Sequence, residues 1–140
     1  MERRDIGSCI EVRTLVRENR YSLEALHQAG ITEDSVAQML ATTHKGWICE
    51  MDGRIVGFSI GNRSNGEFWV VAVLPEYEGR GIGKKLMDLA VEWLRTSGHS
   101  EIWLWTSPDM STRAYALYRK SGWEDCGVKD GQRIMKLKAG

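Results

Sequence analysis

A strand, a glycine-rich loop and a helix follow one another directly between residues 71 and 87, and this segment restricts the fold most. Residues 71–74 are apolar, Pro75 ends the strand, and a helical period begins near residue 81. Glycine occupies alternate positions of the loop, at Gly79, Gly81 and Gly83. This succession of elements is typical of a mixed α/β fold, in which helices pack against a sheet.

The loop also has the features of an anion-binding site. Because glycine has no side chain, the backbone N–H groups can approach an anion closely. The helix N-terminus adds unsatisfied N–H donors and the positive end of the helix dipole. Basic side chains occupy the same place, at Arg80, Lys84 and Lys85. We therefore predict a pyrophosphate site here, in preference to a glycine-rich turn that only connects strand and helix.

Two common phosphate-binding motifs do not fit the spacing. In a Walker A alignment on Gly83-Lys84, Glu78 occupies the first glycine position, and Lys85 stands where Ser or Thr is needed. A dinucleotide-binding Gly-x-Gly-x-x-Gly motif that starts at Gly79 would need glycine where the chain has Lys84. The pyrophosphate site therefore belongs to neither of these classes.

Turn signals and periodicity divide the remaining chain into elements. Strands are predicted at residues 47–51, 55–60, 67–73, 102–106, 124–129 and 133–137. Helices are predicted at residues 6–17, from an N-cap at Thr32 onward, at 81–97 and at 111–121. Many residues of the first helix are β-branched, so a strand at 9–15 is the alternative there. The predicted order is two helices, three antiparallel strands, helix, strand, helix and a final hairpin.

Composition favours a single soluble domain. The chain has 140 residues, which suits one domain, and 19 basic against 19 acidic side chains, so no net field attracts nucleic acid or an anionic membrane. Three widely separated cysteines suggest neither a disulfide framework nor a metal site. The N-terminus lacks a signal peptide, and no run is long enough for a membrane span. We therefore expect a cytoplasmic protein.

The glycine loop resembles the signature of the GCN5-related N-acetyltransferase (GNAT) superfamily, Gln/Arg-x-x-Gly-x-Gly/Ala. Gly81 and Gly83 match it, whereas Glu78 stands in place of the usual Gln or Arg. A second segment, residues 111–123, is similar to the family's Asn-x-x-Ala-x-x-Leu-Tyr-x-x-x-Gly-Phe, with Ser111 for Asn and Trp123 for Phe. The resemblance covers residues 47–123, and two motifs at the right distance are more specific than either alone.

The resemblance implies an α/β (α+β) fold with a mixed, mainly antiparallel central sheet and helices on both faces. Residues 1–140 would form one N-acetyltransferase domain, in which the family's first strand is short or absent. Acetyl-coenzyme A (acetyl-CoA) is the implied co-substrate, and no metal is implied. The residues that the resemblance places at the coenzyme are Val71, Ala72, Val73, Glu78, Gly79, Arg80, Gly81, Ile82, Gly83, Lys84, Ser111 and Tyr118.

The resemblance also implies catalytic roles. The Val71 N–H would polarise the thioester carbonyl, and Tyr118 falls on the tyrosine that protonates the departing thiolate. A buried aromatic side chain on an amphipathic helix is the alternative for Tyr118. Glu67 matches in spacing the glutamate that deprotonates the amine in histone-acetylating members. An ordinary carboxylate at the edge of a strand is the alternative for Glu67.

We therefore predict an N-acetyltransferase that transfers acetyl from acetyl-CoA to a primary amine by direct attack in a ternary complex. The alternatives are an acyl-CoA sensor without transfer activity, a transferase of another acyl group, and a protein that binds another nucleotide such as NAD. The acceptor is a small-molecule amine or a protein amine, and the sequence does not distinguish them. Homodimers are common in such proteins, so the resemblance leaves a homodimer open.

Overall fold

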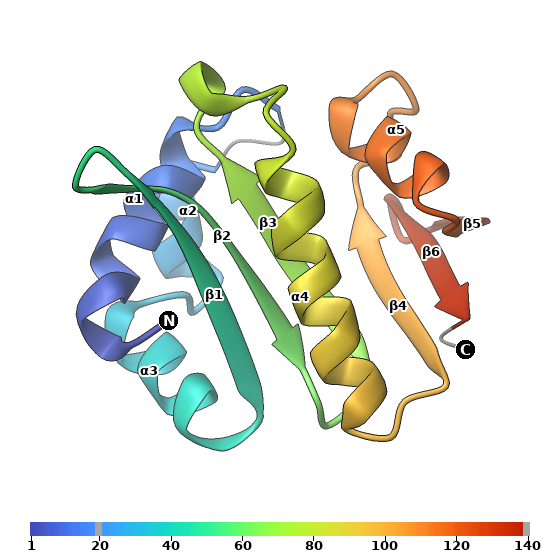
Figure 1. Ribbon diagram of the computed structural model, residues 1–140, viewed down its shortest axis with the longest axis horizontal. Helices are drawn as coiled ribbons and strands as arrows, with labels where there is room; N and C mark the ends of the chain where they lie inside the picture. Colours follow the sequence, from blue (N-terminus) through green and yellow to red (C-terminus); the bar gives the residue numbers. More distant parts are fainter. Residues whose placement is uncertain (19–20, 139–140) are drawn as a thin grey trace.

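Six strands form one sheet in the computed structural model, which describes residues 1–18 and 21–138. The spatial order is β1-β2-β3-β4-β6-β5, and β3 and β4 form the parallel pair in an otherwise antiparallel sheet (Figure 1). The strands are β1 His44–Met51, β2 Arg54–Asn62, β3 Glu67–Val73, β4 Glu101–Thr106, β5 Glu124–Lys129 and β6 Gln132–Lys138. The predicted mixed, mainly antiparallel sheet is confirmed.

Helices cover both faces of the sheet. They are α1 Ile6–Leu15, α2 Leu23–Gln28, α3 Glu33–Thr42, α4 Ile82–Thr96 and α5 Arg113–Lys120, with 3₁₀ turns at Arg3–Asp5 and Pro75–Tyr77. Helices α4 and α5 lie on the near face in Figure 1, and α1, α2 and α3 lie behind the sheet. No helix in the described ranges combines the length and the apolar character that a membrane crossing requires.

The N-terminal region differs from its prediction in one element. The first helix forms, and the alternative strand at residues 9–15 does not. In the described residues a 3₁₀ turn precedes this helix and no strand does, which agrees with the prediction that the first strand is short or absent. The third helix begins at the predicted cap, where the Thr32 hydroxyl accepts the Ser35 N–H at 3.1 Å. Helix α2 was not predicted, because it has six residues and buries only Leu26, which is too little to give a helical period.

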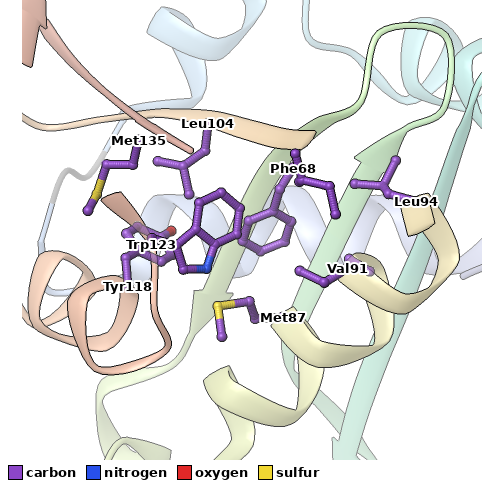
Figure 2. Packing of buried hydrophobic residues seen from close by; sticks show 10 residues of the cluster. Phe68, Met87, Val91, Leu94, Leu104, Tyr118, Trp123 and Met135 are labelled. Carbon is purple, nitrogen blue, oxygen red and sulfur yellow. The ribbon is translucent and has the colours of Figure 1, made fainter. Parts of the chain in front are cut away.

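The sheet separates two apolar cores. On the face of α4, Phe68, Met87, Tyr118 and Trp123 belong to one cluster, which Figure 2 shows from close by. On the other face, α1 packs on the sheet. The core between them contains the residues Cys9, Val12, Val16, Val56, Phe58, Ile60, Ala72 and Leu74. The buried Ser59 hydroxyl donates to the Leu86 carbonyl at 2.9 Å and ties β2 to α4. The central strands are thus held from both sides.

Candidate active site

Strands β3 and β4 pair at one position and then separate. Glu67 stands opposite Trp103, whose N–H donates to the Gly66 carbonyl at 3.2 Å, and no further pair joins these strands in the described residues. Figure 1 shows the two strands moving apart toward their C-terminal ends. On its other side β3 remains paired with β2 as far as Val73. The β4 side of β3 therefore offers backbone groups to an extended ligand, in the way that an exposed sheet edge accepts an added strand.

A β-bulge in β3 changes which side chains share a face. Val70 stands opposite Ile60, but Phe68 stands opposite Gly61, so Trp69 is the extra residue. In a regular strand residues 69 and 70 would point to opposite faces. Here Trp69 and Val70 line the same pocket as Glu67, whereas Phe68 is buried in the cluster on the face of α4. No glycine or proline lies at this bulge within β3 itself, so the sequence analysis missed it.

The loop between β3 and α4 leaves its backbone open. Gly79 and Gly81 have φ angles of +77° and +79°, which side-chain-bearing residues rarely adopt. A Cβ at Gly81 would meet no atom within 4 Å. Gly81 is the N-cap of α4, and no side chain caps this helix. The first N–H groups of α4 therefore face an open loop, which is the arrangement that binds phosphate groups at helix N-termini.

Two arginines offset the acidic residue of the signature. The Glu78 carboxylate lies 3.4 Å from Arg17 Nε and 3.3 Å from Arg113 Nε, and its side chain is only 18% exposed. The loop thus carries no unpaired negative charge at Glu78, although Glu78 departs from the family pattern. The sequence analysis did not single out Arg17 and Arg113, because they come from the segment after α1 and the start of α5 and meet Glu78 only in the fold.

The predicted basic residues of the loop are engaged locally. The Arg80 guanidinium lies 5.0 Å from the centre of the Tyr77 ring, and Lys84 Nζ lies 2.8 Å from Asp88 on the next turn of α4. Both contacts are at the surface, where such pairs contribute little to stability. Arg80 and Lys84 therefore add positive charge beside the helix N-terminus without being fixed in the core.

Helix α5 stands beside the loop and carries the second motif. A Cβ built at Gly83 would lie 3.7 Å from Leu117, which shows how closely α5 approaches the start of α4. The Ser111 hydroxyl donates to Asp109 at 2.7 Å, and Thr112, not Ser111, caps α5. The structure thus brings the residues predicted at 71–73 and 78–84 together with α5, around the opening between β3 and β4.

Tyr118 is buried at the centre of this region. Its side chain is 6% exposed, and its ring centre lies 6.4 Å from that of Phe68 and 5.8 Å from that of Trp123 (Figure 2). Burial raises the pKa of Tyr118, and the nearby positive charge of Arg13 opposes this in part. The Tyr118 hydroxyl is therefore protonated at neutral pH.

The neighbouring tyrosine of α5 has a different partner. The Tyr115 hydroxyl donates to Asp125 Oδ2 at 2.9 Å, and the same carboxylate accepts from Arg133 at 2.8 Å. Tyr115 thus belongs to a polar cluster that joins α5 to the C-terminal hairpin, which makes it a useful comparison for Tyr118.

An apolar pocket of about 280 Å³ lies on the opposite face, between the sheet and the N-terminal helices. Trp69 and Trp105 line it, together with Glu67 from β3 and Arg13 from α1. Burial raises the pKa of Glu67, and a hydrogen bond from the Asn65 side chain opposes the rise. Trp103 does not line this pocket, because its indole N–H donates to the Asn65 carbonyl at 3.0 Å. Glu67 therefore faces a space that can hold a small molecule.

The described residues contain no group of three or more His, Cys, Asp or Glu side chains that could hold a metal ion.

Curated relatives share part of the chain. An uncharacterised N-acetyltransferase of Methanocaldococcus jannaschii is 30% identical over 94 residues, which are 61% of this chain and 41% of the relative. A mycothiol acetyltransferase of Arthrobacter sp. is 32% identical over 108 residues, which are 68% of this chain and 33% of the relative. The chain thus spans less than half the length of these relatives.

Solved structures share the whole fold. PaiA N-acetyltransferase from Thermoplasma acidophilum, in complex with coenzyme A, matches with a TM-score of 0.85 at 19% identity, over 99% of this chain and 96% of that one. The ribosomal-protein-S18-alanine N-acetyltransferase of Escherichia coli matches with a TM-score of 0.74 at 21% identity, over 100% and 93% of the two chains. Residues 11–123 match the acetyltransferase (GNAT) family, so the loop, the second motif and the open sheet lie within the matched region. The chain belongs to the acetyltransferase (GNAT) family.

Proposed function

We propose that this protein is an N-acetyltransferase that binds acetyl-CoA in the opening between β3 and β4 and acetylates a primary amine held in the pocket beside Glu67. The observation that carries the proposal is the open edge of β3, which leads directly into the uncapped N-terminus of α4. A strand edge suits an extended amide-containing chain, and a helix N-terminus suits a pyrophosphate. Coenzyme A contains both groups in sequence.

The donor site is supported from both walls of the opening. Val71, Ala72 and Val73 would supply the strand edge, and residues 78–84 would supply the backbone amides for the pyrophosphate. Ser111 and Tyr118 would contribute from the side of α5. The relative in complex with coenzyme A supports the coenzyme, and the names of the N-acetyltransferase and mycothiol acetyltransferase relatives support acetyl as the group transferred.

The acceptor must lose a proton before it can react. An alkylamine with a pKa near 10.4 is in its nucleophilic form in only about one molecule in a thousand at pH 7.4. Glu67 is the proposed base because it is the carboxylate that lines the pocket, and its raised pKa makes it a better proton acceptor. The proton passes from the amine to the Glu67 carboxylate, directly or through one water.

Two further groups act on the thioester that acetyl-CoA supplies. As the new C–N bond forms and the C–S bond breaks, the Val71 N–H donates to the carbonyl oxygen, where negative charge develops. Tyr118 gives its proton to the departing thiolate, so that free thiol and N-acetylated amine are the products. Burial raises the pKa of Tyr118 and keeps this proton available at neutral pH.

Replacing Glu67 tests the proposed base through the pH dependence of the rate. For the wild type, kcat/KM should fall as the pH drops through the raised pKa of Glu67, because only the carboxylate accepts the proton. In Glu67→Gln we expect a loss of about 100-fold at neutral pH, within the range typical of general acid–base catalysis, and no such acidic limb. The measurement is thiol release at a series of pH values. An unchanged acidic limb in the variant would assign that limb to another group.

The proposed function as a whole is tested by thiol release from acetyl-CoA in the presence of a panel of amines, with other acyl-CoA donors in parallel. We expect amine-dependent release with acetyl-CoA as the preferred donor. Binding of acetyl-CoA without release by any amine would favour a sensor, and preference for a larger acyl group would change the assigned reaction.

A further inference from the structure

Two opposite charges face the same apolar pocket. Glu67 enters it from β3 and Arg13 from α1, and both side chains are half-buried. They are the only charged side chains among the described residues that line this pocket. The other lining side chains are largely apolar, and they include Leu26, Ile31, Trp69 and Trp105. A ligand in this pocket would meet a negative charge, a positive charge and an apolar wall, which favours a ligand with a positive group, a negative group and an apolar part.

Arg13 is held in a defined position at the pocket. Its guanidinium lies 4.6 Å from the centre of the Tyr21 ring, in a cation–π contact with a second residue of the lining. Burial lowers the pKa of Arg13, but an arginine remains protonated in proteins. The guanidinium has five N–H donors in a planar fork, which matches the two oxygens of a carboxylate. Arg13 is thus suited to bind a carboxylate group.

Arg13 and Glu67 line the same pocket of about 280 Å³, so a molecule that contacts both charges there is small. The positive charge of Arg13 acts on Tyr118, the proposed proton donor to the thiolate, and lowers the pKa of that hydroxyl against the effect of burial. The reacting amine must come close to the same thioester. A carboxylate bound by Arg13 would therefore lie next to the reacting amine, as in an α-amino acid, and not at the far end of a long molecule.

We propose, building on the acetyltransferase function above, that the acceptor is a free α-amino acid with an apolar side chain, whose amine faces Glu67 and whose carboxylate is bound by Arg13. The apolar side chain packs against Trp69 and Trp105. The volume of about 280 Å³ is at the small end of ligand pockets and suits one amino acid. A polyamine would bring a second positive charge toward Arg13, and an N-terminal residue of a peptide has no carboxylate at this place.

The test compares matched acceptors that differ only at the carboxylate. Phenylalanine, phenylalanine amide and phenethylamine share the amine and the ring, and leucine and tryptophan give two further sets with their amides and decarboxylated amines. We expect kcat/KM for the free acid to exceed that of both partners by at least about tenfold, the effect typical of a hydrogen-bonded charge pair. If the amides or the decarboxylated amines are acetylated as fast as the free acids in every set, the proposal is wrong.

Substitution of Arg13 assigns the preference to this residue. In Arg13→Met the ratio of kcat/KM between the free acid and the decarboxylated amine should fall to about one, and Arg13→Lys should keep part of it. A ratio, and not an absolute rate, is measured, so a general loss of activity does not imitate the result. A ratio that survives in Arg13→Met would contradict the role of Arg13. If Arg13→Met does not fold, the ratio in Arg13→Lys and the wild-type panel decide.

An equilibrium measurement separates this inference from the acetyltransferase function. With coenzyme A present and no acetyl group to transfer, the free amino acid should raise the melting temperature of the wild type, and its amide should raise it less. If acetyl-CoA itself neither binds nor reacts with any amine, the proposed function fails. If acetyl-CoA binds or reacts but free amino acids show no advantage in rate or in melting temperature, only the acceptor assignment fails.

Discussion

Gly83→Asp is expected to weaken acetyl-CoA binding by about 1,000-fold while the protein remains folded. Gly83 is the second residue of α4, so the new carboxylate would stand at the helix N-terminus where the pyrophosphate is proposed to bind. Two like charges about 4 Å apart repel by about 4 kcal/mol at the effective dielectric constant of a protein surface, which corresponds to about 1,000-fold in affinity. The measurement is isothermal titration of the variant with acetyl-CoA.

The fold should tolerate this change, which makes the result interpretable. A Cβ at residue 83 would make ordinary contacts, 3.7 Å to Leu117 and 3.9 Å to Val73. An acidic side chain in the first turn of a helix is favourable to the helix itself, and aspartate has a higher helix propensity than glycine. Gly83→Ala is the matched control, because it adds the Cβ without the charge and should keep most of the affinity. Wild-type affinity in Gly83→Asp would place the pyrophosphate elsewhere.

Tyr118→Phe is expected to lower kcat by about 100-fold or more, with little change in the affinity for acetyl-CoA. The phenylalanine ring can keep the packing against Phe68 and Trp123, and only the hydroxyl is lost. Because burial raises the pKa of Tyr118, the wild-type hydroxyl remains a proton donor throughout the neutral range. Without it, the thiolate must leave unprotonated or take its proton from water. Thiol release under saturating substrates measures the effect.

The matched control is Tyr115→Phe on the same helix. It also removes one phenolic hydroxyl, but that group is bound to Asp125 in the polar cluster at the hairpin. Its kcat should remain within about threefold of the wild type, since Asp125 keeps its ion pair with Arg133 when the Tyr115 hydroxyl is removed. Equal losses in both variants would indicate that α5 is disturbed as a whole. A wild-type kcat in Tyr118→Phe would leave Tyr118 as a packing residue only.

Local signals predicted the loop and most elements. The alternating glycines, the helix start after Gly81 and the hairpin at Asp52-Gly53 depend on the conformations of a few consecutive residues, and both hairpin residues have positive φ angles, as such a turn requires. The capping of α3 by Thr32 is local in the same sense. Features of this kind are encoded within a few residues of one another, so the sequence pattern is sufficient to predict them.

Features that depend on long-range packing were not predicted. The separation of β3 from β4 involves residues more than thirty positions apart, and the bulge at Trp69 depends on how β2 and β3 align. The contacts of Glu78 with Arg17 and Arg113 join the segment after α1, the loop and α5. The spacing predicted Glu67 as a candidate base. Its place in a pocket shared with Arg13 was not predicted, because it depends on how α1 packs against the sheet.

The measurement that tests the account most directly is the melting temperature of the purified protein with acetyl-CoA, with NAD and ATP as controls. A ligand that binds only the folded state at 100 times its dissociation constant stabilises it by about 2.7 kcal/mol, which for a domain of this size raises the melting temperature by about 8 °C. We expect such a rise with acetyl-CoA and none with NAD or ATP. No rise at saturating acetyl-CoA, or an equal rise with NAD or ATP, would contradict the proposed acetyl-CoA site at the edge of β3.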